Sequence, residues 1–104
     1  MSAPMTFGQL IRACRSERKA TLMGICKKVG GLFNKGYLSG MEHEKVNPPS
    51  PAIVKKLARA LEINEAFLLA LGYASKAPKE VREKLIKLVW TSGEFPTYKL
   101  QVTA

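Results

Sequence analysis

The sequence predicts an all-α fold in which five short helices form one domain, followed by an additional helix and a short strand-like tail. Three observations predict it. Apolar residues recur at helical spacing in six segments, helix-capping residues precede most of these segments, and glycines or prolines separate them. The 104 residues suffice for one domain with a modest core. We expect this domain to occupy residues 1–73 and an extension to occupy residues 74–104.

The first two helices are predicted from their caps and their apolar faces. Thr6 and Gln9 have the spacing of a capping box, which starts a helix that ends near Arg18. Its apolar face comprises Phe7, Leu10, Ile11 and Cys14. Thr21 is a suitable N-cap for the second helix, and Gly30 is a suitable C-terminal stop. The apolar positions between them are Leu22, Ile25, Cys26 and Val29.

The stretch KKVGGLFNKGYLSGMEHE, residues 27–44, holds four of the eight glycines and permits two interpretations. A glycine-rich loop that wraps a phosphate needs a preceding strand and a motif such as GxxxxGK[ST] or GxGxxG, and neither motif occurs. We therefore expect a helix that ends at Gly30, a turn over residues 31–33, and a third helix that Asn34 caps and that extends to about His43.

The fourth and fifth helices follow a proline-rich linker. The run EKVNPPSP, residues 44–51, cannot stay helical because its prolines lack amide donors. Ser50 as N-cap and Pro51 as the first helical residue start the fourth helix. Asn64 caps the fifth helix, which we expect to stop at Gly72. The core stripe of the fourth helix is expected to be Ile53, Val54, Leu57, Ala58 and Leu61.

The extension is predicted to hold one helix and a strand. After a linker, YASKAPKE, Pro78 opens a helix over residues 79–90. Its apolar face is broader than a surface helix requires and comprises Val81, Leu85, Ile86, Leu88, Val89 and Trp90. The final segment alternates apolar and polar residues, the period of a half-buried strand, and a lone strand needs a pairing partner.

Composition favours a protein that binds polyanions over an enzyme. Seventeen Lys and Arg against eight acidic residues, all Glu, give a net charge of +9. This favours a polyanionic partner because each neutralised phosphate releases counterions. His43 is the single histidine, so acid–base pairs and nucleophile relays are nearly unavailable. Cys14 and Cys26 have neither zinc-site nor disulfide spacing, and we expect reduced, buried thiols.

The sequence also argues against several other classes of protein. We expect no metal and no cofactor. No apolar run approaches the ~20 residues that a membrane helix needs, and the amino terminus lacks the pattern of a signal peptide. We therefore expect a cytoplasmic, nucleoid-associated protein with no membrane contact.

Five segments match one known arrangement of helices: FGQLIRACRSER, TLMGICKKVG, YLSGMEHEKVNPPSP, LARALEI and LLALGY. Through them, residues 6–73 resemble the lambda-repressor-like (XRE-type) helix-turn-helix family, whose members share an all-α five-helix DNA-binding domain. The third segment is the most specific. The resemblance implies a transcription regulator whose third helix enters the major groove of double-stranded DNA.

The chain departs from the family pattern at three places. The turn before the third helix is two residues longer, at Gly31-Leu32, an insertion that can tilt or displace that helix. Leu22 stands where members often carry a phosphate-contacting glutamine. Glu44 replaces a common glycine after the third helix, so this helix either continues further or ends in a strained conformation.

Residue types on the third helix indicate candidate DNA contacts. Lys35 and Ser39 suit base or backbone contacts, although both also fit a merely exposed helix face. Gly36 and Gly40 either let the helix backbone approach the bases or are tolerated as weak helix formers. His43 either contacts DNA or caps the end of the helix, where a cation suits the helix dipole.

Further candidates flank the third helix. Tyr37 resembles a family position that packs inward while its hydroxyl reaches a phosphate. Backbone amides of the second helix near Thr21 are placed to meet another phosphate. Non-specific affinity is expected from Lys19, Arg18, Lys27, Lys28 and Lys45.

Two functions remain open at this point. The first is a sequence-specific double-stranded DNA-binding transcriptional regulator, most simply a repressor, that binds an inverted-repeat operator as a homodimer. Residues 79–90 and the tail are the expected dimer contact. The alternative is an antitoxin or protein-binding adaptor, with a protein partner on the apolar face around Leu85, Leu88 and Trp90. The operator, the regulated genes, any effector and the choice between repression and activation are not predicted.

Overall fold

The computed structural model describes residues 4–91, and within them it contains six α-helices and no strand. Their bounds are α1 Phe7–Glu17, α2 Leu22–Lys28, α3 Lys35–Glu42, α4 Pro51–Leu61, α5 Glu65–Lys76 and α6 Lys79–Thr91. The sequence-based prediction of an all-α fold is confirmed for this part of the chain. The predicted strand-like tail lies outside the described residues.

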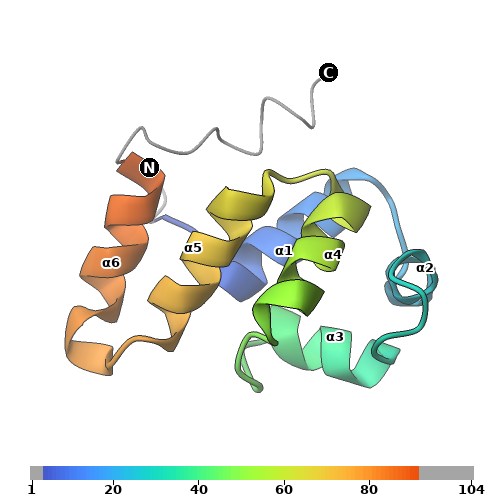
Figure 1. Cartoon of the computed structure of the whole chain (residues 1–104), viewed down its shortest axis with the longest axis horizontal. Coiled ribbons are helices and arrows are strands. Elements are labelled where there is room, and N and C mark those ends of the chain that lie inside the picture. The colour runs from blue at the N-terminus through green and yellow to red at the C-terminus, as the bar shows by residue number, and fades with distance from the viewer. Residues whose placement is uncertain (1–3, 92–104) are drawn as a thin grey trace.

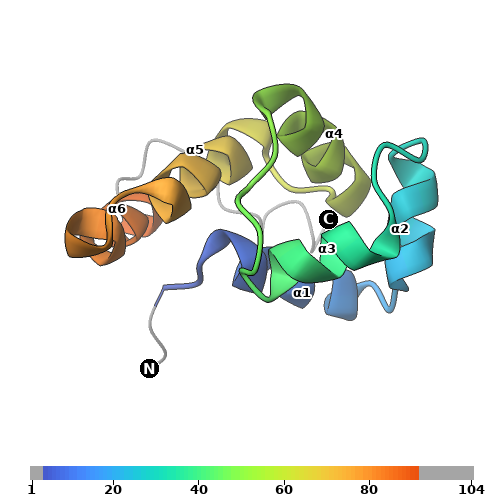
Figure 2. The same cartoon turned by 90° about the horizontal axis from the view of Figure 1, so that it is seen from below.

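The helices form a small bundle in which α5 packs between α4 and α6 (Figure 1). Seen from below, α3 lies alongside α1, and α6 stands at the end of the molecule opposite α2 (Figure 2). The principal extents are 34 × 31 × 26 Å. Because α3 contacts both α1 and α2, its position is determined by these two helices.

The predicted caps start the helices where expected. Thr6 and Gln9 form the complete capping box of α1. The side chains of Thr21, Asn34 and Asn64 each accept the amide hydrogen three residues on, which satisfies one free donor per helix. Ser50 occupies the N-cap position of α4, but its hydroxyl makes no cap hydrogen bond.

The predicted end of the fifth helix at Gly72 is wrong, because α5 continues to Lys76. Gly72 is buried, and a Cβ there would lie 3.5 Å from the ring of Phe7. This distance is an ordinary van der Waals contact, so Gly72 lies inside the helix, in contact with the Phe7 ring, rather than at the end of the helix. The linker shrinks to Ala77 and Pro78, and Ala77 is extended (φ −64°, ψ 157°), as a residue before proline prefers.

The sixth helix belongs to the core rather than to a separate layer. The ring of Trp90 packs edge-on against Phe67 with 4.9 Å between centroids. Its Nε1–H donates to the carbonyl of Met5 at 2.8 Å. Ile86 is buried beside them. The predicted boundary after residue 73 thus falls inside α5.

The prediction that Trp90 shares an exposed apolar face with Leu85 and Leu88 is wrong. Trp90 and Ile86 point toward α5, whereas Val81, Leu85 and Leu88 are 41%, 37% and 58% exposed. The broad face is two faces: one is part of the core, and the other, which we call the outer α6 stripe, comprises Val81, Leu85 and Leu88. The spacing i, i+4, i+7 places all three on one side of the helix.

A buried ion pair joins α1 to α3. Arg15 donates from Nε to Oε2 of Glu42 at 2.6 Å and from a second nitrogen to Oε1 at 3.0 Å. A third nitrogen donates to the carbonyl of Ala20 at 2.9 Å. The Glu42 side chain is 2% exposed, and its hydrogen bond raises the pKa of Arg15. These contacts make Arg15 a structural residue rather than part of a basic outer surface.

The end of α3 is strained, which is the second of the two alternatives expected from Glu44. Glu44 has φ +59° and donates its amide to the carbonyl of Met41, while Lys45 donates to Gly40 at 2.8 Å. This conformation costs a residue with a side chain about 1–2 kcal/mol. The Glu44 carboxylate accepts a hydrogen bond from the Thr6 hydroxyl, which links the end of α3 to the start of α1.

Both cysteines are buried and unpaired by disulfide, as predicted. Burial, together with the nearby Glu17 carboxylate, raises the pKa of the Cys14 thiol to about 12. Burial also raises the pKa of Cys26. Both side chains therefore stay protonated near neutral pH and act as small apolar groups.

Arg15→Ala is expected to lower the free energy of unfolding by about 3–5 kcal/mol, because it leaves the Glu42 carboxylate buried without its cation. Urea denaturation followed by circular dichroism measures the change. Arg12→Ala, at an exposed position of the same helix, serves as the control and should change stability by no more than about 0.5 kcal/mol. Equal losses of unfolding free energy in the two variants would show that the Arg15–Glu42 pair makes no specific contribution to stability.

Candidate nucleic-acid interface

The turn between α2 and α3 depends on two glycines in the left-handed region. Gly30 has φ +75° and Gly31 has φ +74°. Their amides donate to the carbonyls of Lys27 and Cys26, each at 3.0 Å, and close the end of α2. Residues with a Cβ would be strained at both positions. The predicted turn at these glycines is confirmed.

Of the two apolar side chains in the lengthened turn, one is buried and the other is exposed. Phe33 is buried, and its ring lies 5.9 Å from that of Tyr37. Leu32, just before it, is 46% exposed. Asn34 then accepts the Tyr37 amide at 2.8 Å and starts α3. The insertion therefore lengthens the turn without removing the anchors on either side of it.

The inward face of α3 comprises Leu38, Met41 and Glu42, all buried. Tyr37 is half-buried at the edge of the core, so the packing part of its predicted role is confirmed. The predicted contact of its hydroxyl with a phosphate stays a prediction. Lys35 is exposed at the start of the helix.

The two glycines of α3 differ in their surroundings. Gly36 is exposed, and a Cβ there would have only the Asn34 side-chain oxygen nearby, at 3.4 Å. Gly40 is half-buried, and a Cβ there would lie 3.3 Å from a methyl group of Val46. Gly36 therefore leaves bare backbone on the outer face, whereas Val46 covers Gly40.

His43 caps the end of α3. Its Nδ1 lies 2.9 Å from the Ser39 carbonyl and 3.5 Å from the Ser39 hydroxyl. The contact with the carbonyl requires a hydrogen on Nδ1, which therefore donates. This geometry favours the capping interpretation of His43, and it also draws the Ser39 hydroxyl toward the imidazole.

The flanking cations do not all face outward. Arg18 donates from Nε to the carbonyl of Leu61 at 3.0 Å and pairs with Glu62 at 3.2 Å, so it connects α1 to the end of α4. Lys19 and Lys45 are exposed. Arg18 is consequently a weaker candidate for a phosphate contact than the lysines are.

The second helix presents its start to solvent. Thr21 is exposed, and its hydroxyl accepts the amide of Gly24 at 2.9 Å. Lys27 and Lys28 are exposed in the last turn of the same helix. A groove of about 490 Å³ beside that last turn also holds Lys56 and Arg59 of α4. Lys56 and Arg59 were not among the contacts predicted from the sequence, because only the apolar residues of this helix were used there.

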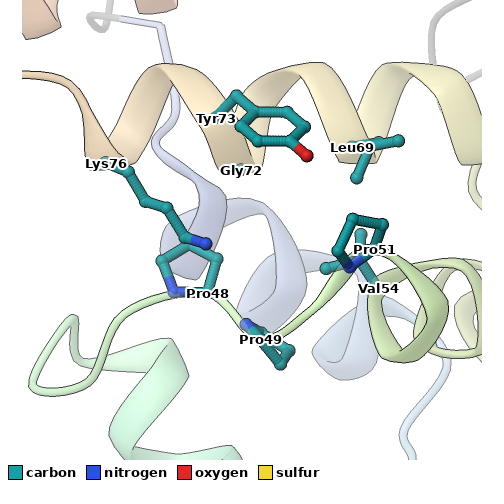
Figure 3. A pocket seen from close by; sticks show the side chains of 8 residues that line it. All are labelled: Pro48, Pro49, Pro51, Val54, Leu69, Gly72, Tyr73 and Lys76. Atoms are coloured by element: carbon teal, nitrogen blue, oxygen red, sulfur yellow. The ribbon is translucent and has the colours of Figure 1, made fainter.

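The linker before α4 is held against α5 by its prolines. Pro48 and Pro49 lie opposite Tyr73 and Lys76, and the Lys76 ammonium is 5.9 Å from the centre of the Tyr73 ring (Figure 3). The recess between them has a volume of only about 10 Å³. Because this is about the space of one water molecule, the contact is a packing contact that fixes the path of the chain leaving α3.

Other kinds of site are not formed by the described residues. Within residues 4–91, no group of three or more His, Cys or acidic side chains is placed to hold a metal ion. No helix in that range has the length and apolar character to cross a membrane.

The chain is similar to several known proteins, although no protein-family model matches it. The HTH-type transcriptional repressor RghR of Bacillus subtilis (strain 168) is 35% identical over 88 residues, which cover 79% of this chain and 64% of that protein. The immunity repressor protein of Bacillus phage phi105 is 29% identical over 90 residues, 78% of this chain and 60% of that protein.

A solved structure agrees with these relatives. A chain of a SinR protein/SinI protein complex superposes with a TM-score of 0.55 and 30% sequence identity, covering 85% of this chain and 82% of that one. The chain belongs to the lambda-repressor-like (XRE-type) helix-turn-helix family. In this XRE-type domain, α2 and α3 are the helix-turn-helix pair. The chain spans 60% to 64% of the length of the two named relatives.

Gly36→Ala separates the two interpretations of the bare face. Replacing an exposed helical glycine should raise the free energy of unfolding by about 0.5–1 kcal/mol. If the α3 backbone approaches the bases, the added methyl group should at the same time weaken binding to a selected DNA duplex. Thermal unfolding and fluorescence anisotropy measure the two effects. Higher stability with unchanged DNA affinity would mean that Gly36 is merely tolerated.

Proposed function

We propose that the chain is a sequence-specific double-stranded DNA-binding transcriptional repressor that acts as a homodimer on an inverted-repeat operator. The observation that supports this most directly is the recognition helix, held by the Arg15–Glu42 pair with Lys35 and Gly36 outward. The relatives named as repressors agree with it. Such a protein acts in the cytoplasm, on the nucleoid, by covering promoter DNA rather than by catalysis.

The proposed contacts fall into two groups. We propose that Lys35 donates to guanine O6 and N7, and that Ser39 and His43 make further contacts along the helix. Phosphates are the proposed partners of the α2 amides at Thr21 and of the Tyr37 hydroxyl. The remaining proposed contacts are the backbone of Gly36 and, less favourably because Val46 covers it, that of Gly40. Lys19, Lys45 and, less favourably, Arg18 are proposed to contribute through charge.

The proposed dimer contact is the outer α6 stripe, Val81, Leu85 and Leu88. Three apolar side chains on one side of an exposed helix resemble half of a helix–helix interface. A two-fold axis through this contact would present two copies of α3 to half-sites about one helical turn, ~34 Å, apart.

An antitoxin or protein-binding adaptor is the second candidate. The same stripe would then hold another protein, and the SinR protein/SinI protein structure is a complex of two proteins. Selection from a random pool of DNA duplexes separates the candidates. An enriched inverted repeat supports the repressor, whereas no enrichment, with a stable partner recovered from native lysate, supports the adaptor.

Lys35→Ala is expected to weaken binding to the selected duplex by about 1–3 kcal/mol if the side chain reads a base. Binding to unrelated DNA should change little. Anisotropy titrations at several salt concentrations test this, with Lys84→Ala on α6 as the matched control. If the substitution weakens binding to both duplexes equally and reduces the number of released counterions by about one, Lys35 contacts a phosphate instead.

Leu85→Lys combined with Leu88→Lys should convert the dimer to a folded monomer, because each charge would be buried without a partner in the interface. Circular dichroism should remain unchanged, since both side chains point away from the core. Light scattering measures the mass. Glu83→Lys is the control, because it changes the net charge by the same amount at an exposed site outside the stripe. A dimeric double variant would assign the contact elsewhere.

A further inference from the structure

The outer face of α3 offers few side chains for reading bases. Gly36 has none, and Gly40 is covered by Val46. His43 is held by its contact with the Ser39 carbonyl. Lys35 is the long side chain that remains at the start of the helix, and a single lysine distinguishes few sequences.

Leu32 lies in the turn immediately before this face, which has few side chains. It is 46% exposed, three positions ahead of the first residue of α3, and therefore within about 11 Å of it along the chain. The turn that carries it is at the end of the molecule away from α6 (Figure 2). An apolar side chain here is surrounded in sequence by Lys27, Lys28 and Lys35.

The turn holds Leu32 in a defined place. On one side, the Gly31 amide is bonded to the carbonyl of Cys26. On the other side, Phe33 is buried in the core and Asn34 caps α3. Phe33 is buried whereas Leu32 is exposed, and these contacts hold the backbone on both sides of Leu32.

We propose that Leu32 determines part of the sequence specificity by packing against the C5-methyl group of a thymine in the major groove. This inference rests on the proposed DNA-binding function. A leucine cannot bind a phosphate, but apolar contact with the thymine methyl is a recognised form of base reading. The flanking lysines bring the DNA backbone close, and the leucine supplies the base discrimination that the bare face of α3 lacks.

Replacing thymine by uracil tests the contact, because uracil differs only in lacking this methyl group. The probe is the duplex enriched from the random pool by the full chain, resynthesised with uracil in one half-site position at a time. At one position, the change to uracil should weaken binding of the unsubstituted protein about four-fold. This factor corresponds to the free energy of burying one methyl-sized group. Leu32→Ala should bind the thymine and uracil duplexes equally, whereas Leu32→Met should keep most of the difference.

Repeating the selection with Leu32→Ala provides a second measurement, in which the enriched sequence should lose its preference for thymine at that position. Equal thymine preference in Leu32→Ala and the unsubstituted protein would overturn the proposal, as would a selected half-site without thymine. If neither protein enriches any duplex, the DNA-binding function itself fails. If only Leu32→Ala loses all DNA binding while retaining its helical circular dichroism, Leu32 positions α3 rather than reading a base, which also overturns the proposal.

Discussion

The position of α3, the second helix of the helix-turn-helix pair, depends on one buried ion pair. Arg15 uses three nitrogens to hold both oxygens of Glu42 and the carbonyl of Ala20, so a single guanidinium connects α1, the following loop and α3. A pair with this geometry is tolerated in the interior because nearly every polar atom finds a partner. The close contact at Gly8 supports it, since a Cβ there would lie 2.3 Å from the carbonyl of Met41.

Ion pairs within the protein affect how its basic composition should be interpreted. The net charge of +9 suggests a uniformly cationic surface, yet several arginines are already paired within the protein. Arg15 binds Glu42, Arg18 binds Glu62, and Arg59 binds Glu65. The charge available to a polyanion is therefore carried mainly by exposed lysines, whose hydrated ammonium groups suit backbone phosphates.

Local signals in the sequence predicted the start of each helix, because caps such as Thr6 and Asn34 act over three or four residues. Features that depend on tertiary contacts were not predictable in the same way. Gly72 is a residue type that often ends a helix, but here it lies inside α5 against Phe7. Trp90 belongs to an apolar face whose division into core and surface depends on where α5 lies. Among the site residues, Arg18 was assigned by its charge alone, and its partners on α4 are more than forty positions away.

The contact between Trp90 and Met5 gives the molecule a spectroscopic property. Trp90 is the sole tryptophan of the chain, and it is held between the Phe67 ring and the Met5 carbonyl, at the junction of α6 with the rest of the bundle. Its emission therefore reports whether α6 is docked, without any added label. Since α3 contains no tryptophan, this fluorescence can distinguish undocking of α6 from changes at α3.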